Sequence, residues 1–76
     1  MAKLNRETKH SVKVGDILQF THDSYIVTNI IRDERDSNRI CFTIRDTKNG
    51  RPIYAYPSSK LYGAEIVPFI DEGANI

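Results

Sequence analysis

The sequence has no tryptophan and only one cysteine, Cys41, among its 76 residues. One cysteine excludes an internal disulfide framework and is too few for a structural zinc site. No apolar run approaches the ~20 residues that a membrane-spanning helix needs. The first residues also lack the apolar centre and the small-residue cleavage site of a signal peptide. We therefore expect a soluble protein without a membrane partner, in a bacterial cytosol or, if phage-encoded, in the cytosol of the host.

Catalytic and metal-binding motifs are missing as well. The four glycines are scattered along the chain, so no phosphate-cradling loop is present. The two histidines, His10 and His22, have no Cys, Asp or Glu at metal-ligand spacing. The consecutive residues His22, Asp23 and Ser24 are interpreted as a hairpin turn, because the members of a catalytic triad converge from separate positions. We expect a protein that is not an enzyme and that holds no cofactor or metal.

Charge is nearly balanced over the chain but is unevenly distributed, with a net value of +1. The first thirteen residues are basic, and a basic arm can contact phosphate because Lys and Arg release condensed counterions. A solvated, frayed terminus is the alternative interpretation. We expect a flexible basic arm over residues 1–11 and a tail over residues 71–76. The candidate phosphate contacts are Lys3, Arg6, Lys9 and Lys13.

Alternating and β-branched residues predict β-strands, while helical periodicity is almost absent. The expected strands, separated by turn residues, cover 12–20, 24–32, 39–46, 52–56 and 64–70. Five short strands with short connections predict an antiparallel meander, and in so small a chain such a sheet must curl to enclose a core. We expect a single all-β domain, a five-stranded small barrel over residues 12–70. Leu61 is expected to plug one end of it.

The order of "VKVGDILQF", "YIVTNI", "ICFTIRD", "IYAY" and "AEIVPF" resembles the SH3-like small barrel, and "VGDIL" with "YIV" is similar to openings of bacterial SH3-like barrels. The resemblance implies a short 3₁₀ turn before the last strand. "YPSSKLYG" is distantly similar to the Pro-Ser-Asn-Tyr segment of peptide-binding SH3 domains. Tyr62 lies farther from Pro57 than that motif places it, and there is no Ala-Leu-Tyr-Asp-Tyr segment. The resemblance therefore implies a fold and no proline-rich peptide specificity.

The hairpin around Asn49-Gly50 determines which way Tyr54 and Tyr56 point. An even number of loop residues places Ile53 and Ala55 in the core and both tyrosines outside. Strand 39–46 then turns Ile40, Phe42 and Ile44 into the same core. An odd number, with a bulge at the glycine, shifts the register by one and buries both tyrosines. We prefer the even loop because it sets aliphatic side chains against the aliphatic residues of strand 39–46.

The leading hypothesis is a non-enzymatic interaction module that binds a protein partner through a tyrosine-bearing sheet face. Tyrosine is stiff and amphipathic, which suits recognition; half-buried rings that shield a thin core are the alternative. Small size also fits a phage or mobile-element protein that modulates a host factor. The candidate binding residues are Tyr54, Tyr56, Arg45, Thr43, Tyr62 and Arg51.

Two further hypotheses remain open. Nucleic-acid binding would pair the tyrosines with Arg45, Arg51 and the basic arm, since small barrels often combine aromatic platforms with basic groups. Self-association as a homodimer would use strand 24–32, which is apolar on both faces.

Overall fold

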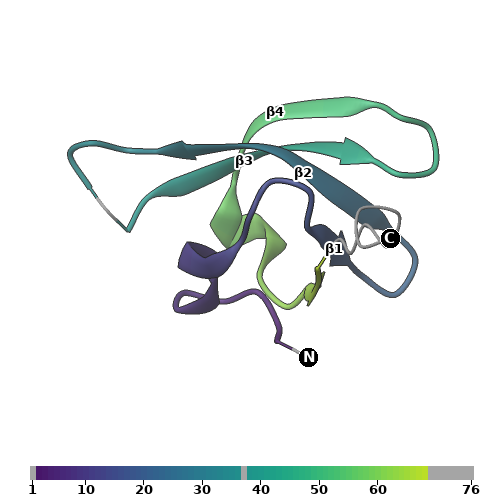
Figure 1. Ribbon diagram of the computed structural model, residues 1–76, viewed down its shortest axis with the longest axis horizontal. Helices are drawn as coiled ribbons and strands as arrows, with labels where there is room; N and C mark the ends of the chain where they lie inside the picture. The colour runs from purple at the N-terminus through teal and green to yellow at the C-terminus, as the bar shows by residue number, and fades with distance from the viewer. Residues whose placement is uncertain (1, 37, 69–76) are drawn as a thin grey trace, which may run out of the picture.

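The protein folds into one five-stranded antiparallel sheet with two one-turn 3₁₀ helices, as a computed structural model shows for residues 2–36 and 38–68 (Figure 1). The elements are η1 (Thr8–Ser11), β1 (Ile17–Gln19), β2 (Ser24–Arg32), β3 (Ile40–Asp46), β4 (Pro52–Pro57), η2 (Ser58–Leu61) and β5 (Glu65–Val67). The predicted all-β class, the five antiparallel strands and the 3₁₀ turn before the last strand are confirmed. The predicted tail, 71–76, and the end of the fifth predicted strand lie outside the described residues.

The sheet is open. Its strand order is β4-β3-β2-β1-β5, so β4 and β5 form the two edges within residues 2–36 and 38–68. The strands therefore do not close into the small barrel that the sequence predicts. β5 pairs with β1 on one side, and on the other side it meets the N-terminal segment: Lys3 forms an antiparallel bridge with Glu65, and the Ile66 N–H donates to the Ala2 carbonyl at 2.9 Å. The chain passes from β4 to β5 through η2, which packs against β3 and β4. Figure 1 shows η1 and η2 on the same side of the sheet.

That side, here called the concave face, carries the core. Alternation along the strands points Leu18, Val27, Phe42 and Ile44 into it, and all four are almost fully buried. Complete burial of such a side chain contributes about 1.5–3 kcal/mol. The predicted burial of Phe42 and Ile44, together with Ile40, is confirmed, as is that of Leu61. The buried hydrophobic cluster consists of Leu4, Val12, Leu18, Val27, Ile40, Phe42, Ile44, Leu61 and Ala64.

The N-terminal segment, for which the sequence predicts a flexible arm, contributes side chains to this core. Leu4 is only 1% exposed, its N–H donates to the Ala64 carbonyl at 2.7 Å, and its carbonyl accepts the Gly63 N–H at 2.8 Å. Lys9 is also buried, and its ammonium donates to the Asn38 carbonyl. The physical reason is the thinness of the core: a small domain buries little surface, and Leu4 supplies an apolar side chain that the strands do not.

The β3–β4 hairpin has an even loop, as preferred from the sequence. Four residues separate Asp46 from Arg51; the Asp46 N–H donates to the Arg51 carbonyl at 3.0 Å, and the Gly50 N–H donates to the Asp46 carbonyl at 2.8 Å. Gly50 has a φ of 73°, which favours glycine. In this register Ile44 faces Ile53, which points to the concave face as expected.

Further along β4 the alternation breaks. The register shifts between Phe42 and Ile44, so that Tyr54 and Ala55 together lie opposite Thr43 alone. This is a β-bulge, with Ala55 at a φ of 49°. After the bulge Tyr56 pairs with Phe42 and lies on the concave face, whereas Ala55 is exposed. The predicted positions of Ala55 in the core and Tyr56 outside are therefore wrong, while the outward position of Tyr54 is confirmed.

Thr43 lies between two such irregularities. On the other side of β3 the register shifts between Val27 and Asn29, which leaves Thr28 as an extra residue in β2. The Thr43 hydroxyl accepts the Ala55 N–H at 3.3 Å, and its carbonyl accepts the Thr28 hydroxyl at 3.1 Å. Bulges bend a strand and increase its local twist, and here two of them meet at Thr43.

The bulge makes stability sensitive to the residue at position 55. Replacing Ala55 by valine should lower the free energy of unfolding by about 1–2 kcal/mol, because a β-branched residue at positive φ is strained. Urea denaturation measures the change. Ala55→Gly is the matched control and should be neutral or slightly stabilising, because glycine adopts positive φ without a steric cost. Equal stability of the valine and glycine variants would contradict a bulge centred on Ala55.

Candidate binding pocket

The predicted tyrosine face is divided among three places. Tyr54 is 75% exposed on the outer face of the sheet, opposite to the concave face. Tyr56 is half-buried on the concave face. Tyr62 follows η2, is 37% exposed, and lines a separate hollow with Lys9 and Pro57. These three rings do not form one surface.

The other predicted binding residues stay with the outer face or at the hairpin. Arg45 is exposed there and pairs with Pro52, two residues before Tyr54, so the arginine and this tyrosine share a face. Arg51 is exposed at the end of the hairpin loop. Thr43 is buried, and its hydroxyl accepts the Ala55 N–H in the bulge, so it does not contribute to a binding surface.

The candidate phosphate contacts do not gather into one patch. Lys9 is buried, with its ammonium engaged by the Asn38 carbonyl. Lys3 and Lys13 are exposed but line two different hollows, and Arg6 is exposed in the segment between them.

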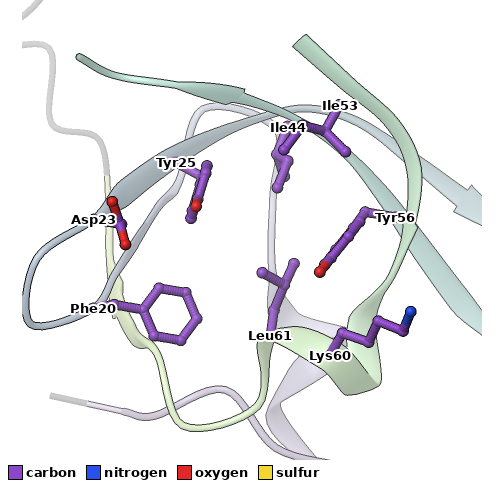
Figure 2. Close-up of a pocket in the computed structure, with 8 residues that line it drawn as sticks. All are labelled: Phe20, Asp23, Tyr25, Ile44, Ile53, Tyr56, Lys60 and Leu61. Atoms are coloured by element: carbon purple, nitrogen blue, oxygen red, sulfur yellow. The ribbon is translucent and has the colours of Figure 1, made fainter. Parts of the chain in front are cut away.

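A pocket of about 230 Å³ opens at one end of the concave face, between the β1–β2 turn, β4 and η2 (Figure 2). Of the predicted binding residues, only Tyr56 lines it. Alternation from Leu18 through Phe20, and from Val27 back to Tyr25, is the sequence signal that places both aromatic residues on the core side. The lining residues are Phe20, Asp23, Tyr25, Ile44, Ile53, Tyr56, Lys60 and Leu61.

The β1–β2 turn holds one wall. The Phe20 N–H donates to the Asp23 carbonyl at 2.7 Å, which closes a tight turn and brings both residues to the pocket. Tyr25 then enters β2 opposite Leu18, so its ring faces the same way as the buried leucine. The rings of Phe20 and Tyr25 meet edge to face, with centroids 6.2 Å apart and planes at 77°. This geometry is favourable for aromatic pairs.

The hairpin loop fixes this turn from the other side. The Thr47 N–H donates to the Ser24 carbonyl at 3.1 Å, and the two side-chain hydroxyls are 2.5 Å apart. The Lys48 ammonium donates to the His22 carbonyl at 2.5 Å. These contacts join segments more than twenty positions apart, so the pocket wall does not depend on the turn alone.

Tyr56 lies across the pocket from Phe20, and Figure 2 shows its hydroxyl directed into the enclosed space. The Lys60 ammonium is 5.9 Å from the centroid of the Tyr56 ring, within the range of a cation–π contact. Figure 2 shows this ammonium turned away from the enclosed space. Ile44, Ile53 and Leu61 complete the lining with apolar surface.

The environment of Tyr25 disfavours the ionised form of its phenol. Burial raises the pKa of its phenol above the ordinary value of 10.0, and the charges of Asp23 and Asp46 and the neighbouring Tyr56 phenol raise this pKa further. The phenol is therefore neutral at physiological pH and can donate a hydrogen bond.

Within the described part of the chain, no three His, Cys, Asp or Glu residues gather to hold a metal ion. No helix in this part is long and apolar enough to cross a membrane.

Comparison with protein-family models, curated proteins and solved structures finds no match to this chain. Two of the three aromatic rings that line the pocket are tyrosines, and tyrosine is enriched among the residues that dominate binding at protein interfaces.

The raised pKa of Tyr25 gives a measurable pH dependence. A phenol that holds its proton more tightly in the folded state stabilises the fold fully below about pH 10, and this stabilisation is lost as pH rises through the folded-state pKa. Replacing Tyr25 by phenylalanine should remove that part of the alkaline decrease in the free energy of unfolding. Tyr54→Phe, which leaves the pocket intact, is the control. Ring NMR signals of Tyr25 that titrate at or below pH 10 would contradict the geometry.

Proposed function

We propose that this protein is a non-enzymatic interaction module that binds a protein partner, and that the binding surface is the pocket of Figure 2. The observation that carries the proposal is the convergence of three aromatic rings from separate segments: Phe20 follows β1, Tyr25 belongs to β2 and Tyr56 belongs to β4. Aromatic residues in a shaped hollow are the usual anchors of protein recognition.

The size of the pocket favours a side chain over a whole small molecule. Its volume of about 230 Å³ is below the roughly 300–1,000 Å³ of ordinary ligand pockets. One side chain from a loop or an extended segment of a partner suits such a space, with neighbouring residues of the partner resting on the rim.

The edge of the sheet favours the same mode of binding. β4 is an edge strand that begins and ends with proline, at Pro52 and Pro57, and contains the bulge at Ala55. Prolines and bulges interrupt the row of backbone groups that another strand would need for pairing. A partner is therefore recognised through the pocket rather than by addition of a strand at β4.

We also propose that the fold is an unclosed form of the SH3-like type, in a cytosolic protein. The supporting observation is that β1 to β4 follow one another in the sheet while β5, preceded by η2, returns to pair with β1. The phage or mobile-element context remains a hypothesis from small size.

Nucleic-acid binding is the second candidate. Exposed Tyr54 and Arg45 on the same outer face support it, since aromatic platforms beside basic groups bind single strands. The burial of Lys9 and the separation of Lys3 from Lys13 weigh against a continuous phosphate-binding track.

A homodimer through β2 would have to use the outer face, because β2 is paired along both of its edges.

The two surfaces are distinguished by paired variants. In a pull-down from native cell extract, Tyr56→Leu should reduce capture of the bound protein about tenfold or more, as expected for an interface anchor. Tyr54→Ala should leave capture unchanged. Urea denaturation of both variants checks that the fold survives, and leucine keeps position 56 apolar so that the core is retained. Loss of capture with Tyr54→Ala and not with Tyr56→Leu would place binding on the outer face and overturn the proposal.

A further inference from the structure

The pocket rings present a chemistry that favours positive charge. The face of an aromatic ring is electrostatically negative and attracts an ammonium or guanidinium group within about 6 Å of its centroid. Phe20, Tyr25 and Tyr56 line the same space of about 230 Å³, so a cation inside it lies near three rings at once. Aromatic enclosures of this kind recognise cations in other proteins.

The charged groups around the pocket reinforce this preference. The carboxylate of Asp23 lies at its wall, and Asp46 is close enough to affect the Tyr25 phenol. Two ammonium groups also lie close to the pocket, but each of them makes another contact. The Lys48 ammonium donates to the His22 carbonyl, and the Lys60 ammonium lies over the Tyr56 ring and away from the enclosed space.

Lys60 already places a cation near one of these rings. Its ammonium has a long, flexible stem and is free to extend into solvent, yet it lies 5.9 Å from the Tyr56 centroid. The side of the pocket that faces Phe20, Tyr25 and Asp23 holds no cation among the described residues that line it.

We infer that the pocket receives a lysine or arginine side chain of the partner protein, with the cation between the three rings and beside the Asp23 carboxylate. This inference rests on the proposed function, because it names the chemistry of the partner group that enters the same pocket. The apolar stem of the guest side chain packs against Ile53 and Leu61, and the Tyr25 and Tyr56 phenols lie near its charged head.

Other guests fit less well. A neutral apolar side chain would cover Asp23 and two phenols without offering them a hydrogen bond, and unpaired burial of polar groups is costly. An anionic side chain would meet the charge of Asp23 directly, and Asp46 pairs with Tyr25 across the strands. A cation is the guest that both the aromatic rings and the carboxylates attract.

The test uses short peptides of glycine and serine that carry one central guest residue: lysine, arginine, norleucine or glutamate. The full chain is titrated with each peptide, and the ring signals of Phe20, Tyr25 and Tyr56 are followed by NMR. Norleucine keeps the apolar stem of lysine without its charge. We expect the lysine and arginine peptides to bind about threefold to thirtyfold more tightly than the norleucine peptide, the range of a cation–π contribution.

Two variants that each remove one charge beside the pocket test the same preference for a cation. Asp23→Asn should weaken binding of the lysine peptide severalfold. Lys60→Met should strengthen it, because it removes a cation beside the pocket and keeps the apolar stem. Both residues are exposed, so the fold should be retained, which urea denaturation checks.

Each remaining outcome separates this inference from the proposed function. Equal binding of the norleucine and lysine peptides at the same ring signals would overturn the cationic guest and leave a protein-binding pocket. Preference for the glutamate peptide, or lysine-peptide binding that is strengthened by Asp23→Asn and weakened by Lys60→Met, would overturn it as well. If no peptide shifts the ring signals while Tyr56→Leu still abolishes partner capture, the pocket binds a partner through other chemistry and the inference fails.

Discussion

The hydrogen bond from the Ala55 N–H to the Thr43 hydroxyl is the contact on which the arrangement of this protein depends. It fixes a bulge that sets two residues of β4 against one residue of β3. Without the extra residue, regular alternation would place Tyr56 on the outer face beside Tyr54. With it, Tyr56 lies on the concave face, and the aromatic pocket becomes a consequence of one local irregularity.

The open sheet is the second requirement. A sheet closed between β4 and β5 would cover the end of the core, whereas here η2 brings Leu61 under the concave face and leaves a space beside it. Leu4 of the N-terminal segment buries a further side chain, so that a short sheet still encloses a core. Core and pocket are therefore continuous: Ile44 and Leu61 belong to the buried cluster and also line the pocket.

Much of this fold follows from local sequence rules. Alternation through β3 identifies the buried positions, and the even loop at Gly50 gives the register as far as Ile53. The bulge could not be read from the sequence, because alanine has no preference for positive φ and Ala55 is held there by Thr43 from the neighbouring strand. The burial of Leu4 could not be predicted either, because a single apolar residue within a basic segment shows no periodicity. The pocket could be predicted in part, because alternation in β2 points Tyr25 towards the core.

The central claim is that the bulge turns the Tyr56 ring into the pocket while the Tyr54 ring stays outside, and nuclear Overhauser contacts in the full chain test it most directly. We predict contacts between the Tyr56 ring and the methyl groups of Ile53 and Leu61, which line the same pocket, and none between the Tyr54 ring and those methyl groups. Contacts of the Leu61 methyl groups with Tyr54 in place of Tyr56 would contradict the account.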